Sequence, residues 1–206
     1  MKRAFWIATS LGIIVCMTSA STLATAAPAP KKVIEDPAED ANGLNDQGAG
    51  DGTNGDNVTP ADAGNASDLL SVSISNDAKN VSIAVSAQLT PPATQGLGYR
   101  VRFNPDGPGG THCVIVEAFW PGAGNDLTAP KGHVRDACAG GDPVPIEILG
   151  YMLVVPRSAH KAFAKGATLK APQAQSFVWL GSSYPAGVAA FYIDTTKIGT
   201  DYKLVK

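Results

Sequence analysis

A period-two alternation of apolar and polar residues is the feature that most constrains the fold of this chain. Leu70, Val72 and Ile74 alternate with serines, and a second run with the same period covers residues 81–87. Alternation at every second residue is typical of β-strands that bury one face. Because the intervening residues 75–80 (SNDAKN) are rich in turn formers, the two runs are predicted to form a hairpin.

Further short apolar runs, separated by Gly and Pro, predict an antiparallel β-sandwich. Residues 113–120 are apolar on both faces, which is typical of a central strand. One short helix is predicted at residues 156–165, ending at Gly166, with Phe163 buried beneath it. The expected strands after the hairpin cover residues 99–103, 113–120, 133–137, 145–149, 151–155, 176–180, 188–193 and 202–205. The predicted fold is therefore an all-β antiparallel sandwich with one short helix, over residues 68–206.

The chain opens with the pattern of a secretory signal peptide. A basic pair (KR) precedes an apolar run over residues 4–17, and an A-T-A cleavage signal follows at residues 24–26. A membrane anchor is disfavoured because the run is shorter than the roughly 20 apolar residues of a span. A lipoprotein is disfavoured because Val15, rather than a small residue, precedes Cys16. We therefore expect removal of residues 1–26, secretion to the extracellular space and no membrane span.

Residues 27–67 form an acidic segment rich in Gly, Asn and Asp, and no Lys or Arg occurs between Lys32 and Lys79. Calcium takes about six to eight oxygen ligands, and this segment supplies closely spaced carboxylate and amide oxygens. The predicted calcium ligands are Asp36, Asp40, Asn42 and Asp46, with Asp68 and Asp194 as the next candidates. A solvated, flexible linker is the alternative, and the spacing does not decide between the two. Val33 and Ile34 differ from the rest of the segment, because they suit the edge of a sheet.

Two cysteines remain once the leader is removed, Cys113 and Cys138. An exported chain meets an oxidising environment, so the pair is predicted to form a disulfide. Such a bridge would contribute about 3 kcal/mol by the chain-entropy model. A zinc site with the neighbouring His112 and His133 is the alternative, and it is disfavoured because the chain has no C-x-x-C pair.

Several short motifs follow one another in a recognisable order. They are D-P-x-x-D-A-N-G at 36–43, D-L-L-x-V-x-I-S-N-D at 68–77, V-P-R-S-A at 155–159, K-G-A-T-L at 165–169 and an aromatic strand ending in D-T-T at 194–196. This order resembles secreted bacterial β-sandwich domains of the DOMON-like and family-nine carbohydrate-binding-like kind. The resemblance implies binding of ligands such as sugars or haem rather than catalysis. It also implies a structural calcium near a D-P-x-G-D motif, in which this chain has Glu39 at the glycine position.

Aromatic residues are the candidates for sugar binding, since their rings can stack on a sugar ring. The predicted ligand-binding residues are Tyr184, Trp179 and Trp120. Tyr184 lies in the loop GSSYPAG and is expected to be exposed. Aromatic residues within strands more often belong to the core, which is the alternative interpretation for both tryptophans.

Taken together, these features predict a monomeric, non-catalytic extracellular module that binds a carbohydrate or cell-wall glycan or has a structural role. Basic residues are scattered rather than clustered, which disfavours a nucleic-acid groove. The alternative is a secreted hydrolase. Residues 158–161 match S-x-x-K, but S-D-N and K-T-G do not follow, and G-x-S-x-G is absent. The histidines at 112, 133 and 160 are also widely separated in the sequence.

Overall fold

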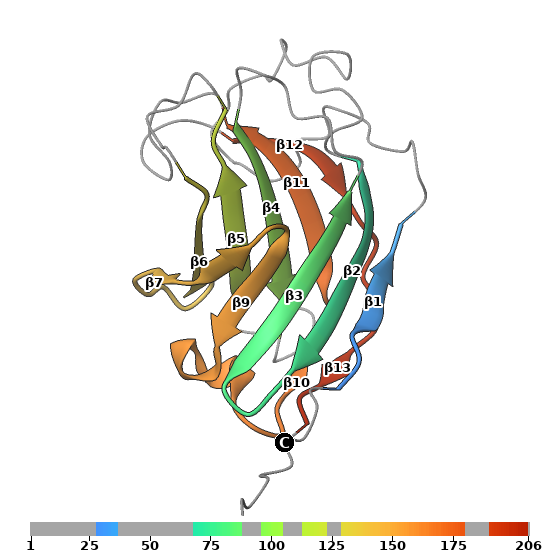
Figure 1. Cartoon of the computed structure of the whole chain (residues 1–206), viewed down its shortest axis with the longest axis vertical. Helices are drawn as coiled ribbons and strands as arrows, with labels where there is room; N and C mark the ends of the chain where they lie inside the picture. The colour runs from blue at the N-terminus through green and yellow to red at the C-terminus, as the bar shows by residue number, and fades with distance from the viewer. Residues whose placement is uncertain are drawn as a thin grey trace, which may run out of the picture.

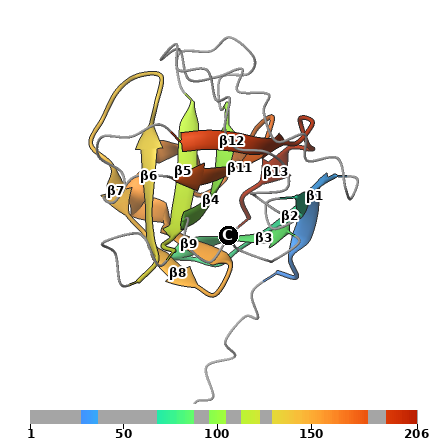
Figure 2. The ribbon, with the colours of Figure 1, turned by 90° about the horizontal axis from the view of Figure 1, so that it is seen from above.

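A computed structural model describes residues 28–36, 68–87, 96–104, 113–122, 129–179 and 190–205. These residues form two packed antiparallel sheets, as Figures 1 and 2 show, so the predicted β-sandwich is confirmed. The first sheet contains, in spatial order, β1 (Lys31–Glu35), β2 (Leu69–Asn76), β3 (Asn80–Ala87), β9 (Met152–Pro156) and β8 (Glu147–Leu149). The second contains β12 (Ala190–Thr195), β11 (Gln173–Trp179), β4 (Gly96–Phe103), β5 (Val114–Trp120), β6 (Lys131–Asp136) and β7 (Val144–Pro145). A small ladder joins β10 (Thr168–Leu169) to β13 (Tyr202–Lys203).

The predicted hairpin is present, because β2 and β3 are adjacent and antiparallel and Ile74 faces Ile83 across the pair. Asp77 fixes its turn by accepting hydrogen bonds from the backbone N–H groups of Lys79 and Asn80, each at 2.7 Å. These bonds lower the pKa of Asp77. The prediction that β5 is central is also confirmed, since it lies between β4 and β6 and is buried on both faces.

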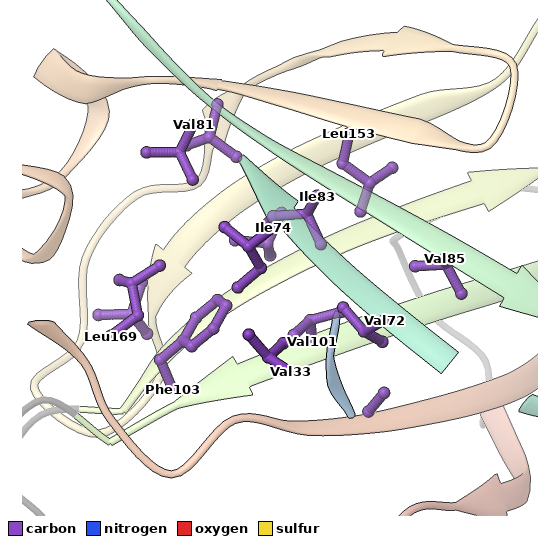
Figure 3. Packing of buried hydrophobic residues seen from close by; sticks show 14 of the residues in the cluster. Val33, Val72, Ile74, Val81, Ile83, Val85, Val101, Phe103, Leu153 and Leu169 are labelled. Atoms are coloured by element: carbon purple, nitrogen blue, oxygen red, sulfur yellow. The ribbon is translucent and has the colours of Figure 1, made fainter. Parts of the chain in front are cut away.

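The core fills the space between the two sheets. Figure 3 shows Ile74 and Ile83 of the first sheet close to Val101 and Phe103 of the second. All four side chains are fully buried. Val33 and Ile34 of β1 join the same cluster, as their apolar character predicted, and β1 is the edge strand next to β2. Burial of such side chains, at roughly 25 cal/mol per Å² of apolar surface, is the main stabilising contribution in the sandwich.

Both lateral edges of the sandwich are crossed by the chain. The expected strand at residues 145–149 divides at Ile146, so that β7 belongs to the second sheet and β8 to the first. Ile146 donates its backbone N–H to the carbonyl of Gly132 and packs against the core. On the opposite edge, Thr200 donates its backbone N–H to the carbonyl of Val33 at 2.8 Å. These crossings occupy backbone groups that an open sheet edge would leave for other chains.

The helix expected at residues 156–165 is instead two 3₁₀ turns, η2 (Arg157–Ala159) and η3 (Lys161–Phe163). His160 separates them because its backbone is extended, with φ of −158° and ψ of 147°. Its ring Nδ1 accepts a hydrogen bond from the backbone N–H of Ala162 and so caps the second turn. The helical prediction was therefore wrong in form, but Phe163 is fully buried as expected and lies edge-on to Phe103, with ring centroids 6.3 Å apart.

One end of the sandwich is fastened by several side chains, and we call it the pinned end. The disulfide joins Cys113, just before β5, to Cys138, just after β6. At the same end, the buried Asn76 donates its amide Nδ2 to the carbonyl of Val205 at 2.9 Å. Its Oδ1 accepts from the backbone N–H of Val205 and from the hydroxyl of Tyr202. The final described residues are thus tied to the end of β2.

Candidate functional site

The opposite end is where β1, β3, β5 and β11 end and where β2, β4, β6 and β12 begin, and we call it the loop end. The connections 37–67, 88–95, 123–128 and 180–189 join strands there. All the sequence-predicted ligand residues map to this end or to its connections. Trp120 is the last residue of β5, Trp179 is the last residue of β11, and Asp36 follows β1. Tyr184, Asp40, Asn42 and Asp46 lie in these connections, outside the described residues. Function often concentrates in loops carried by one end of a rigid sandwich.

Three aromatic residues form a row near the loop end. The ring of Trp120 lies edge-on to Tyr99, with centroids 5.5 Å apart, and tilted by 34° against Tyr151, with centroids 5.3 Å apart. Tyr99 is buried, Trp120 is partly buried and Tyr151 is 39% exposed. We call these residues the aromatic row. It runs from the core to the surface and joins the two sheets, because Tyr99 and Trp120 belong to the second sheet and Tyr151 precedes β9 of the first.

Strand pairing brings the backbones of the predicted ligand residues Trp120 and Trp179 close to each other. Trp179 pairs with Gly96 at the start of β4, and Trp120 pairs with Leu97, the next residue of that strand. Both therefore flank the beginning of β4 on opposite sides. The side chain of Trp179 is outside the described part of the structure. The ring of Trp120 packs against the core, as the alternative interpretation expected, and it is still partly exposed. Its role as a ligand residue stays a prediction.

Burial of Tyr99 has an electrostatic consequence. Burial raises the pKa of its phenol, and the nearby Tyr151 raises it further. The neutral phenol of Tyr99 is accordingly the stable form throughout the physiological pH range.

Three buried aspartates surround the start of β2. Asp36 donates its backbone N–H to the carbonyl of Leu70 at 3.0 Å. Asp194 of β12 accepts the backbone N–H of Leu69 through Oδ2 at 2.7 Å. Asp68 directly precedes Leu69, and all three aspartates are at most 9% exposed. Burying several carboxylates near one another is costly unless hydrogen bonds or cations compensate for the lost hydration.

The described residues do not by themselves form a complete metal site. Among them, no group of three or more His, Cys, Asp or Glu side chains is arranged to hold a metal ion. Asp36 and Asp68 nevertheless stand at the two ends of the connection 37–67, which contains the other predicted calcium ligands. Carboxylate oxygens are the donors that calcium prefers, so the chemistry of these residues fits that ion.

The predicted disulfide between Cys113 and Cys138 is confirmed, with Cα atoms 5.2 Å apart. The zinc alternative is thereby ruled out, because both sulfurs are bonded to each other. Asp136 organises the bridge through its Oδ1, which accepts the backbone N–H groups of Cys113, Cys138 and Ala139 at 3.1–3.3 Å. Sequence reasoning missed this role for Asp136, because the N–H group of Cys113 reaches its carboxylate only when β5 and β6 pair.

A charged group lies on the face of the second sheet that points away from the first. Arg100 donates Nε and Nη2 to Oε2 of Glu117, at 2.5 Å each. Nε2 of His133 is 3.9 Å from Oε1 of Glu117. The strands place these three residues in one row across β4, β5 and β6. Burial lowers the pKa of His133; Glu117 opposes this shift, while Arg135 and Arg100 add to it. The carboxylate of Glu117 therefore already forms a salt bridge with Arg100.

Among the described residues, His160 and Asp136 form a second pair of a histidine and a carboxylate, and this pair also has a structural role. Nε2 of His160 is 3.5 Å from Oδ2 of Asp136, while Nδ1 accepts the backbone N–H of Ala162. A serine nucleophile needs a ring nitrogen with a lone pair directed at its hydroxyl. In His160 that lone pair already accepts the Ala162 N–H, so the arrangement does not serve the nearby Ser158 as a base. The S-x-x-K match at 158–161 thus spans two 3₁₀ turns rather than a catalytic helix.

Comparison of the chain with protein-family models, with curated proteins and with solved structures gives no match. No helix within the described residues is long and apolar enough to cross a membrane. The site is therefore interpreted from its own geometry.

Proposed function

We propose that this chain is a secreted, monomeric, non-catalytic binding module that holds an extracellular or cell-wall glycan at the loop end. One observation carries the proposal. The aromatic row and the strand ends that bear the other predicted ligand residues lie at the same end of the sandwich. Aromatic rings offer a large apolar surface with little conformational freedom to lose on binding. The leader pattern and the disulfide support an extracellular location.

We further propose that a structural calcium ion orders the connection between β1 and β2. Asp36 would bind it together with Asp40, Asn42 and Asp46, and the buried Asp68 and Asp194 lie with Asp36 around the start of β2. The connection is acidic, and between Lys32 and Lys79 the chain has no Lys or Arg to balance that charge. A divalent cation would offset the repulsion between carboxylates. The ion would have a structural role, fixing the loop rather than taking part in a reaction.

Binding of the mature protein, residues 27–206, to immobilised polysaccharides and a glycan array tests the main proposal. We expect retention on at least one glycan and competition by the free oligosaccharide. Retention that no soluble glycan reverses would contradict glycan binding. Hydrolysis of the bound polymer, detected as newly formed reducing ends, would favour the hydrolase alternative instead.

Thermal unfolding with calcium, with magnesium and with chelator tests the metal proposal. Binding to the folded state alone stabilises it by about 2.7 kcal/mol at a hundredfold excess over Kd. Extracellular calcium modules bind at roughly 10⁻⁴–10⁻³ M, so several millimolar calcium should raise the Tm more than magnesium does. Asp36→Asn combined with Asp40→Asn should abolish that difference, while Asp142→Asn, an exposed acid elsewhere, should keep it. Equal shifts with both ions would indicate a solvated acidic linker.

A further inference from the structure

The three residues of the aromatic row differ in exposure, and Tyr151 is the most exposed of them. Tyr151 lies in the turn between β8 and β9, where Leu149 pairs with Met152. Gly150 provides the positive φ of 62° that this tight turn requires. The carbonyl of Tyr151 accepts the backbone N–H of Val85 at the end of β3. The backbone of Tyr151 is therefore fixed by the turn between β8 and β9 and by the hydrogen bond to β3.

Trp120 is in a different situation, because rings contact it from two directions. Tyr99 supports it from the core, and Tyr151 lies against it at 34°. The exposed apolar surface at this place is thus provided mainly by Tyr151, which is 39% exposed, and by Leu149 of the same turn, which is 50% exposed. Sequence reasoning selected Trp120 as one of three contact residues, together with Tyr184 and Trp179, whereas its packing between two rings suits a supporting role.

Four described segments that contain or flank the aromatic row carry no charge, and the adjoining Arg100 and Glu117 form an ion pair on the opposite face of the second sheet. The four segments are residues 84–87 (AVSA), 96–99 (GLGY), 118–122 (AFWPG) and 148–153 (ILGYML), and they contain no Asp, Glu, Lys, Arg or His. A ligand rich in carboxylates or phosphates would need Arg or Lys partners at its binding site. An uncharged ligand needs no charged partner at its binding site. The electrostatics at this surface therefore favour a neutral ligand.

We infer that Tyr151 is the ring that contacts the glycan, that Trp120 is a positioning residue, and that the ligand is a neutral polysaccharide. The electron-rich face of an aromatic ring attracts the slightly positive edge of a partner group. The C–H groups on one face of a neutral pyranose provide such a partner, and its hydroxyls remain in water. This inference rests on the proposed glycan binding at the loop end and specifies its contact residue and ligand class.

Retention of the mature protein on neutral glucans and galactans, compared with polygalacturonate and teichoic acid, tests the inference. Wild type should bind a neutral polymer more tightly than either anionic one. Tyr151→Ala should weaken binding at least tenfold, Tyr151→Phe should stay within threefold of wild type because it keeps the ring, and Ile198→Ala should have no effect. Ile198 is a suitable control because it is 62% exposed and lies away from the aromatic row.

The outcomes separate this inference from the proposed function. If wild type binds a neutral glycan and Tyr151→Ala binds equally well, the contact assignment is wrong while the proposed function stands. Retention only on anionic polymers would overturn the ligand class alone. Failure of wild type to bind any glycan would overturn both. Retention lost in mild non-ionic detergent, yet unaffected by free oligosaccharide, would indicate an apolar or protein partner and would also overturn the inference.

Tryptophan fluorescence gives a second readout, and the emission of Trp120 without ligand shows whether each variant is folded. After removal of the leader, Trp120 and Trp179 are the remaining tryptophans, so Trp179→Phe leaves Trp120 as the sole emitter. The affinity of this variant is measured first. Saturation with a neutral oligosaccharide should shift the emission of Trp120, and adding Tyr151→Ala should raise the oligosaccharide concentration needed for that shift at least tenfold. Binding that leaves the Trp120 emission unchanged would place the ligand elsewhere.

Discussion

The two ends of the sandwich are stabilised by different kinds of interaction. At the pinned end, the contacts are a covalent bridge, the hydrogen bonds of Asn76 and the buried pair Phe103 and Phe163. At the loop end, the described contacts are the aromatic row and backbone hydrogen bonds around buried aspartates. The described stabilising contacts are thus concentrated at the pinned end, whereas the residues proposed to bind a glycan lie at the loop end. Removing contacts at the pinned end should therefore reduce stability, whereas removing them at the loop end should reduce binding.

The largest expected difference between the ends comes from truncating an aromatic ring at each. Phe163→Ala removes a fully buried ring and should cost about 3–5 kcal/mol of unfolding free energy. Tyr151→Ala removes a partly exposed ring and should cost about 1 kcal/mol or less. Urea denaturation of both variants gives the comparison. Similar losses for the two would mean that the ends do not differ in this way.

Removal of the disulfide should have the next largest effect. Cys113→Ser with Cys138→Ser opens a loop with a sequence separation of 25 and should cost about 3 kcal/mol. Glycan affinity below the new Tm should not change, because the bridge lies at the pinned end. Mass spectrometry after alkylation without reduction checks the starting protein. Two alkylated thiols in wild type would show that the bridge does not form.

A smaller effect on stability is expected from the protonation of His133, which lies between the two ends. Because burial lowers its folded-state pKa below the usual 6.5, the unfolded chain binds a proton more readily than the folded chain. The resulting stability is fully present above about pH 6.5 and is lost as the pH falls below it. His133→Gln should flatten the dependence of Tm on pH between about 7 and 5, before most carboxylates titrate. A profile identical to wild type would show that His133 does not contribute.

Much of the sandwich could be predicted from local pattern, because strand alternation is encoded in neighbouring residues. The β2–β3 hairpin, the double-sided burial of β5 and the burial of Phe163 all follow from such patterns. The division of a strand at Ile146 does not, since alternation says which face is buried but not which sheet a residue joins. The 3₁₀ turns were missed because the extended His160 caps its own chain through a side-chain hydrogen bond.

The candidate site was predictable only in part, because local sequence pattern does not specify contacts between distant strands. Trp120 was selected by residue type, but its contact with Tyr151 links two sheets through a tertiary arrangement. The position of Asp194 beside Leu69 likewise depends on how β12 meets β2. Composition indicated the chemistry of these residues. Their grouping at one end required the three-dimensional fold.

The packing of Gly98 has a consequence for sequence variation. The ring of Phe177 lies over Gly98 so closely that an added Cβ would be 2.0 Å from Cζ of the ring. The same ring lies 5.9 Å from the guanidinium carbon of Arg100. No side chain can therefore be gained at position 98 while Phe177 keeps its place. Homologous sequences should show covariation at these two positions, with larger residues at 98 accompanied by smaller ones at 177.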